Sequence, residues 1–183
     1  ASVIHTTALL MDGSVACWGN VASSDCGGPF DDGNPVMAMA VGDGHSIARR
    51  ADGSIRCWGD DGNGQIEVPE GIGTVANPAV DVAAGHFHSV AVLADGSIAC
   101  WGDDSQGQCT VPAGIGTPRR PVVAAAAGNA HTVALLADGD VITTTIDGVG
   151  TITNRCRRLP DHPNASTIPA GWRPAWKAST TDD

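Results

Sequence analysis

Residues 83–116 read AAGHFHSVAVLADGSIACWGDDSQGQCTVPAGIG, and this stretch decides the fold. It contains an apolar run, the pair Asp95-Gly96, and a second apolar run that ends in Cys-Trp-Gly. Short runs rich in Val, Ile and Ala around Asp-Gly are typical of two β-strands, which we expect to be joined by a two-residue hairpin turn with positive φ. Both faces of each run are apolar, so we expect strands that are buried on both sides.

The same pattern recurs along the chain. A histidine precedes four of the Asp-Gly pairs, at residues 12–13, 52–53, 95–96 and 138–139, by seven residues. The steps between these histidines are 40, 43 and 43 residues: His5, His45, His88 and His131. Cys-Trp-Gly occurs at residues 17–19, 57–59 and 100–102. Repetition at a fixed period of about 20–50 residues indicates a repeat architecture.

Each unit contains three or four expected strands. A third apolar run, at residues 122–128, precedes the last repeated histidine, and a weaker fourth run lies near residues 108–112. Frequent Pro and Gly between the runs disfavour helices. Three or four short strands in about 43 residues form a propeller blade, which needs neighbouring blades to cover its faces.

The order Gly-x-x-His-Ser-x-Ala, Asp-Gly, Trp-Gly and Gly-Gln resembles the repeat of the regulator of chromosome condensation family over roughly residues 1–142. That family forms seven-bladed β-propellers, and its members include a GTPase exchange factor, an ultraviolet photoreceptor, arms of HECT-type ubiquitin ligases and a β-lactamase inhibitor. The resemblance implies an all-β fold, here a partial or small β-propeller of about three to four blades with an irregular C-terminal tail. It does not choose a function, because one fold serves many.

We divide residues 1–145 into repeats at 1–40, 41–83, 84–126 and a partial 127–145, followed by an irregular tail at 146–183. The first repeat lacks a first strand, and the fourth has Thr143-Thr144-Thr145 in place of Cys-Trp-Gly. Three arrangements remain open: a fragment of a longer ring, a closed four-bladed propeller, or an open arc. We favour the open or partial ring.

Charge and composition disfavour several classes of function. The net charge is −10, with +2 on residues 153–183 and therefore −12 on the rest. An acidic propeller is a poor match for nucleic acid, whose phosphates attract clustered Lys and Arg. No apolar run reaches the length of about 18 residues that a membrane span needs. The sequence contains no Cys-x-x-Cys spacing, so a zinc site is not supported. We expect no cofactor.

Two pairs of cysteines share a spacing of nine residues, Cys17 with Cys26 and Cys100 with Cys109. Each pair either forms a disulfide within one blade or consists of free buried thiols, and we favour the free thiols. Repeat two has Ile66 at the matching place. Bonds between the cysteines of neighbouring Cys-Trp-Gly motifs are not expected, because packed sheets lie about 10 Å apart.

The repeated histidines and aspartates are expected to be structural. A side chain that recurs in every blade performs the same task in each, whereas a catalytic group stands in one place. We expect each histidine to hydrogen-bond to the backbone near the start of a strand, and each aspartate to form the turn. His86 alone departs from the pattern. The chain is therefore predicted not to be an enzyme.

We expect a non-enzymatic protein–protein interaction or scaffold module, an accessory subunit docked in a larger assembly; the alternative is a small-GTPase exchange factor or the substrate-binding arm of a HECT-type ubiquitin ligase. Trp18, Trp58 and Trp101 are expected in the core. Two tail tryptophans either pack on the last blade, which we favour, or anchor a partner. The candidate partner-binding residues lie in the blade loops and the tail: Asp60, Asp61, Asn63, Asp103, Asp104, Gln106, Arg155, Arg157, Arg158, Trp172 and Trp176.

Overall fold

The computed structural model describes residues 5–19, 32–137, 140–143 and 153–155, and this part of the chain contains twelve strands and no helix. In chain order, the strands are β1 (His5–Leu9), β2 (Val15–Gly19), β3 (Val36–Val41), β4 (His45–Arg50), β5 (Ile55–Gly59), β6 (Ala79–Ala84), β7 (His88–Leu93), β8 (Ile98–Gly102), β9 (Val122–Ala127), β10 (Thr132–Leu136), β11 (Asp140–Thr143) and β12 (Thr153–Arg155). All the pairings between them are antiparallel.

The strands form four sheets, which we call blades 1 to 4. Blade 1 contains β1 and β2, blade 2 contains β3 to β5, blade 3 contains β6 to β8, and blade 4 has the order β12-β11-β10-β9. The predicted all-β propeller repeat is confirmed. The proposed repeat boundaries after residues 40, 83 and 126 fall one residue before the end of β3, β6 and β9, so sheet and sequence repeat are offset.

The Asp-Gly hairpins are tight, but their geometry differs from the expected two-residue turn. In blade 3 the amide of Gly96 donates to the carbonyl of Leu93, and the amide of Leu93 donates to the carbonyl of Ser97. Only Gly96, at φ 82°, is left-handed, and no residue other than glycine has positive φ in the described part of the chain. This is a three-residue loop in which a turn is followed by a left-handed glycine. Asp95 accepts the amide of Ser97 at 2.9 Å and so fixes the turn, as predicted.

The expected fourth strand near residues 108–112 does not form. The region after β8 consists of turns, with one isolated bridge between Thr117 and Arg120. The reason is local: the side chain of Gln108 accepts the amide of Gln106 at 2.9 Å, which holds the backbone in a loop that cannot pair with β8. Within the described residues, blades 1 to 3 therefore consist of three strands or fewer, and only blade 4 has a fourth, β12.

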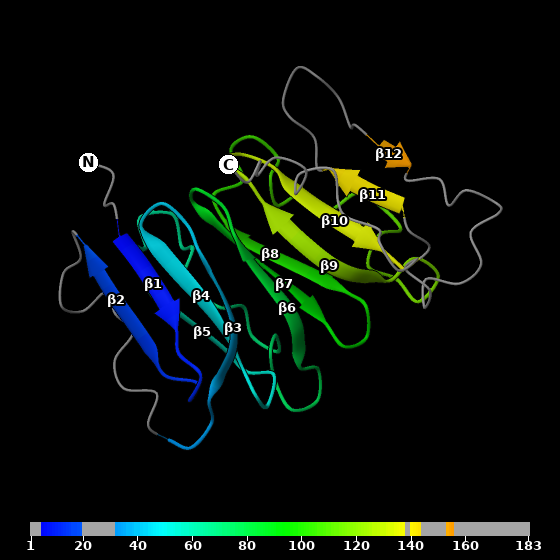
Figure 1. Ribbon diagram of the computed structural model, residues 1–183. Helices are drawn as coiled ribbons and strands as arrows, with labels where there is room; N and C mark the ends of the chain where they lie inside the picture. Colours follow the sequence, from blue (N-terminus) through cyan, green and yellow to red (C-terminus); the bar gives the residue numbers. More distant parts are fainter. Residues whose placement is uncertain (1–4, 20–31, 138–139, 144–152, 156–183) are drawn as a thin grey trace, which may run out of the picture.

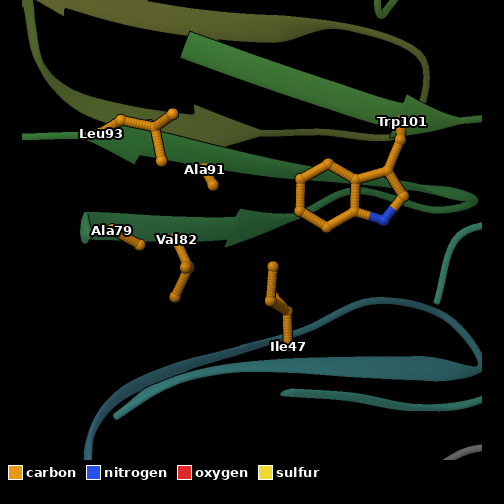
Figure 2. Packing of buried hydrophobic residues seen from close by; sticks show 6 residues of the cluster. All are labelled: Ile47, Ala79, Val82, Ala91, Leu93 and Trp101. Carbon is orange, nitrogen blue, oxygen red and sulfur yellow. The ribbon is translucent and has the colours of Figure 1, made fainter. Parts of the chain in front are cut away.

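Neighbouring blades pack face to face through apolar side chains. Between blades 2 and 3, Ile47 contacts a cluster that includes Ala91, Leu93 and Trp101, and Figure 2 shows the indole of Trp101 directed toward Ile47. Strand β7 is buried at all six positions, which confirms the prediction from its two apolar faces.

The tryptophans of the Cys-Trp-Gly motifs in blades 2 and 3 pack against the preceding blade. Trp58 and Trp101 are 6% and 7% exposed, as expected for core residues. Trp18 of blade 1 is 55% exposed, so the core assignment is wrong for this residue. The cause is position, because blade 1 is the first in the row and the described residues place no blade before it (Figure 1).

The four blades form an open arc, with blade 1 and blade 4 at opposite ends (Figure 1). The first strands of blades 2, 3 and 4 approach one another, β3 against β6 and β6 against β9, so they form the inner edge of the arc. The closed four-bladed ring is therefore wrong for this chain. Strand β12, which lies in the predicted irregular tail, pairs with the outer edge of blade 4.

The prediction that the cysteines spaced by nine residues are free thiols is wrong for Cys100 and Cys109. Cys100 and Cys109 form a disulfide within blade 3, with their Cα atoms 5.0 Å apart. Cys17 is also disulfide-bonded, while Cys26 lies outside the described residues. Cys57 is free, and burial raises the pKa of its thiol to about 12, with a smaller contribution from Asp61.

Candidate functional site

The repeated histidines link each blade to the next. Nε2 of His45 lies 3.0 Å from Oγ of Ser89, which belongs to the following blade. The Ser89 hydroxyl donates to the main-chain oxygen of Gln65 at 2.8 Å, so its own oxygen is left to accept the Nε2–H of His45. The expected histidine–backbone contact is therefore wrong, because a hydroxyl group stands between the imidazole and the carbonyl.

The next junction repeats this arrangement. Nε2 of His88 lies 3.1 Å from Oγ1 of Thr132, and the Thr132 hydroxyl donates to the main-chain oxygen of Gln108 at 2.8 Å. Burial lowers the pKa of His88 and favours the neutral imidazole. Gly85 makes room for this ring, since a Cβ there would overlap the imidazole of His88. The spacing Gly-x-x-His therefore reflects the packing of the histidine ring against the glycine three residues before it.

The Gly-Gln segments hold the loops that follow the third strands. Gln65 is completely buried; its amide nitrogen donates to Asp60 at 3.0 Å and its amide oxygen accepts the backbone N–H of Asn63 at 2.8 Å. Trp101 of the next blade donates its indole N–H to the main-chain oxygen of Gln65, at 3.0 Å. Each loop therefore joins two blades through a buried glutamine.

The predicted partner-binding carboxylates lie in these loops and shape them. Asp61 accepts the amide of Ile66 at 3.1 Å, and Asp104 accepts the amide of Cys109 at 2.7 Å. Asp103, which is half-buried, accepts the amide of Ser105 at 3.0 Å and the side-chain amide of Gln108 at 2.7 Å. The pKa of Asp103 is lowered by these hydrogen bonds, led by the one from Ser105.

The two loops therefore present the same outer surface in blades 2 and 3. Asp60, Asp61 and Asn63 are exposed in the first loop, as are Asp104 and Gln106 in the second. Of the tail candidates, Arg155 lies at the end of β12 and pairs in register with Asp140 of β11. Arg157, Arg158, Trp172 and Trp176 lie outside the described residues.

A small cavity lies beside the inner ends of the first strands. It has a volume of about 360 Å³ and is lined by Val41, Gly42, Asp43, Ala84, Gly85, His86, Ala127, Gly128 and Asn129. His86, the off-pattern histidine, lies in its wall with Nε2 3.1 Å from a carboxylate oxygen of Asp43. His86 and His88 therefore have different partners and do not form a joint site.

A second hollow, which sequence reasoning missed, is apolar. We call it the blade-1 groove; its volume is about 290 Å³, and its lining is Leu9, Leu10, Met11, Asp12, Gly13, Pro35, Val36 and Met37. Its large side chains are exposed: Leu10 is 47%, Met37 54% and Met11 fully accessible. Exposed apolar groups that gather in this way mark interaction surfaces.

A bulge explains why Met37 is exposed. The register of β3 against β4 shifts between Val36 and Ala38, which turns the residue between them out of the blade. Val80 occupies the same place in blade 3 and is 47% exposed. In the sequence, a proline followed by two apolar residues marks the start of the first strand in blades 2 and 3. This order could have indicated where Met37 and Val80 lie, but it does not reveal the bulge that exposes them.

A sequence model of the regulator of chromosome condensation (RCC1) repeat matches residues 38–65 and 79–108. These segments contain the histidine, the Asp-Gly turn, the Trp and the buried glutamine of blades 2 and 3. The chain carries repeats of the RCC1 family. Blades 2 and 3 thus match the RCC1 repeat, and the contact from His45 to the Ser89 hydroxyl joins two neighbouring RCC1 repeats. No curated protein matches the chain in sequence.

Solved structures share the RCC1 fold. The human protein WBSCR16 is 19% identical with a TM-score of 0.65, over 81% of this chain and 49% of that one. Prp20p from Saccharomyces cerevisiae, described with its binding to Gsp1p and histones, is 20% identical with a TM-score of 0.63, over 87% and 49%. The ectodomain of the receptor kinase CR4 from Physcomitrella patens is 24% identical with a TM-score of 0.58, over 76% and 38%.

This chain spans less than half the length of each of these RCC1-fold structures. Because the identities are below 25%, these structures show a shared fold, and the partner of this chain must be inferred from its own surface. Within the described residues, no helix is long and apolar enough to cross a membrane.

Proposed function

We propose that the chain is a non-enzymatic protein–protein interaction module that docks, as an accessory subunit, in a larger assembly. The observation that carries this proposal is the blade-1 groove, where Leu9, Leu10, Met11 and Met37 expose apolar side chains around a concave surface. Burying such side chains against a partner is favourable by about 25 cal/mol per Å² of apolar area, before the costs of association.

The repeated polar residues support a role without chemistry. His45, His88, Ser89 and Thr132 are buried, and their hydrogen bonds join neighbouring blades. A general base must reach a substrate proton within hydrogen-bond distance. Since Nε2 of each of the two histidines is engaged by a hydroxyl in the core, we assign them to the architecture.

The acidic loops lie at the end of blades 2 and 3 that is opposite to the hairpin turns, so they would form a polar contact surface separate from the blade-1 groove. Asp60, Asp61, Asn63, Asp104 and Gln106 are exposed, and their geometry is fixed by the buried glutamines. Charged groups around an apolar contact set the rate of association and the choice of partner more than affinity. We therefore propose a partner with an apolar segment for the blade-1 groove and a separate basic segment for these loops.

A photo-crosslinking amino acid at Met11 tests the docking proposal in the native host extract. The matched control is the same group at Val75, which is 90% exposed in the turn that follows the loop of blade 2. We expect a discrete protein adduct from position 11 and none from position 75. Equal adducts at both positions, or none at position 11, would contradict the proposal.

The regulatory alternatives rest on resemblance alone. An exchange factor accelerates the release of nucleotide from a small GTPase, whereas a docking module does not. Release accelerated by the purified chain would replace the docking proposal with the exchange-factor alternative.

A further inference from the structure

The start of each first strand is held between two Asp-Gly hairpins. In β6 the amide of Ala79 donates to the carbonyl of Gly53, in the hairpin of blade 2, at 2.9 Å. The carbonyl of Pro78 accepts the amide of Ala94, in the hairpin of blade 3, at 2.9 Å. The starts of β3 and β9 form the same two bonds, at 2.9–3.1 Å. The result is a continuous edge, which we call the hairpin rim; it consists of residues 10–14, 35–37, 51–54, 78–80, 94–97 and 121–123.

An exposed apolar side chain occupies the same place on each of these strand starts. Register shifts leave Met37, Val80 and Val123 bulged out of the pairing with the second strand, and they are 54%, 47% and 48% exposed. Strands β3, β6 and β9 lie side by side (Figure 1), so the three side chains form one row. Val80 lies between two described hairpins, so its exposure belongs to the middle of the arc and not to an end.

A carboxylate lies at each of the hairpins beside this row. Asp12, Asp52 and Asp95 are exposed, and each accepts the backbone N–H of the serine two residues further on, at 2.8–2.9 Å. Hydrogen bonds from these serines, led by their hydroxyls, hold the pKa of the three carboxyls below the ordinary value. The hairpin rim therefore presents negative charges and apolar side chains in alternation.

Packing does not account for the apolar row. A bulged, half-exposed residue contributes little to the core, so a polar side chain would fit there equally well. Apolar side chains nevertheless recur in three successive blades, and exposed apolar groups that gather in this way mark contact surfaces. The blade-1 groove contains Asp12 and Met37, so it is the first part of the same rim.

We propose that the hairpin rim binds an extended segment of another protein that carries apolar side chains for the row and basic side chains for the hairpin carboxylates. The inference rests on the proposed docking function, and it specifies the segment that enters the blade-1 groove and where that segment continues. The same bound segment contacts blades 1 to 4 in turn.

The spacing of the blades favours an extended segment. Packed sheets lie about 10 Å apart. Three residues of a polyproline II helix advance about 9.3 Å and complete one turn, so every third side chain points the same way. A segment with an apolar residue at every third position therefore meets the bulged residue of each blade.

Charge complementarity selects basic residues for the positions between. Asp12, Asp52 and Asp95 lie on the hairpins of blades 1 to 3, while Arg119 and Arg120 lie in the turn that leads to β9. The basic residues of the segment therefore face blades 1 to 3. Opposite charges at a contact favour the matching partner and disfavour an acidic one.

Binding of three labelled twelve-residue peptides to the 183-residue chain, measured by fluorescence anisotropy, tests this inference. The peptides repeat Leu-Lys-Pro, Leu-Glu-Pro or Ser-Lys-Pro four times. We expect the Leu-Lys-Pro peptide to bind, and each of the other two to bind at least about tenfold more weakly. Val80→Ser should weaken the first peptide by about fivefold. Asp52→Asn keeps an acceptor for Ser54 but loses the charge, and should weaken it by about threefold.

Val41→Ser is the matched control, because Val41 is 38% exposed at the other end of β3, away from the rim; it should bind like the wild type. Circular dichroism confirms that each variant is folded, and Val123→Ser is a second variant in the row. No binding of Leu-Lys-Pro, equal binding of Leu-Glu-Pro, or binding that Val80→Ser and Val123→Ser leave unchanged would overturn the inference. If Met11 still crosslinks to a protein in that case, docking at the blade-1 groove stands and its continuation along the rim is excluded.

Discussion

At the residue scale, the polar side chains that recur in every repeat connect blades. His45 and His88 each contact a hydroxyl that lies 44 residues further along the chain. Recurrence alone indicates a shared structural task, and that prediction is consistent with the contacts. The identity of the partner could not be predicted, because it depends on which faces two sheets turn toward each other.

The buried His88 should make stability depend on pH. Burial lowers its pKa below the ordinary value, with Asp103 opposing the shift and His131 adding to it. The imidazole of His88 is therefore protonated more easily in the unfolded chain than in the folded protein. The free energy of unfolding should fall as the pH drops below about 6.5. Chemical denaturation at pH 7.5 and 5.5 measures this loss, and His88→Gln should reduce it.

The pH range and a matched variant separate the effect of His88 from that of other titrating groups. The aspartates with lowered pKa values, such as Asp52 at about 2, lose their contribution only at more acidic pH. Asn129→Gln, on the cavity wall, removes no titrating group; it is the matched variant and should keep the wild-type pH dependence. If His88→Gln and wild type lose the same free energy between the two pH values, the account of His88 is wrong.

At the element scale, the hairpins were predictable and the loops between blades were not. Apolar runs around Asp-Gly indicate two strands and a tight turn without further information. The loops at Gln65 and Gln108 depend on side-chain contacts with the backbone, which a strand pattern does not contain. The same limit applies to the bulge that exposes Met37, and hence to the blade-1 groove.

Two glycines with left-handed backbone, Gly53 in a hairpin turn and Gly71 in the segment between blades 2 and 3, should resist substitution to different degrees. Gly53 and Gly71 have φ of 79° and 84°, where a side chain costs about 1–2 kcal/mol. A Cβ on Gly53 would also overlap Pro78 of the next blade, whereas none of the atoms around Gly71 lies within 4 Å. We expect Gly71→Ala to lower the free energy of unfolding by about 1 kcal/mol and Gly53→Ala by about 3 kcal/mol. Equal losses in urea denaturation would contradict the contact with Pro78.

Blade 2 should accept the disulfide that it lacks. Ile66 holds the place of Cys109, and Cys57 holds the place of Cys100. Ile66→Cys should therefore form a disulfide with Cys57, closing a loop of about ten residues and stabilising the fold by about 2–3 kcal/mol. Intact mass before and after reduction detects the bond, and Ile66→Ser is the control. A variant with two free thiols would show that the loops of blades 2 and 3 are not equivalent.

At the scale of the whole molecule, the sequence period predicted the number and kind of blades but not how they close. Closure depends on whether the first blade can reach the last, and no local pattern contains that information. The prediction of a row of RCC1-type blades is confirmed, while the closed small ring is wrong. The exposed Trp18 follows from the same geometry, because a motif that is buried inside the row is exposed at its end.

The central claim is that the repeated histidine and hydroxyl bind adjacent blades to each other. A double-mutant cycle with His45→Ala and Ser89→Ala, measured as free energies of unfolding in urea, tests it directly. We predict a coupling energy of about 1 kcal/mol or more for this pair, which crosses one junction, and additivity within about 0.3–0.5 kcal/mol for His45→Ala with Thr132→Val, which does not. Additive losses for His45 and Ser89 would contradict the claim.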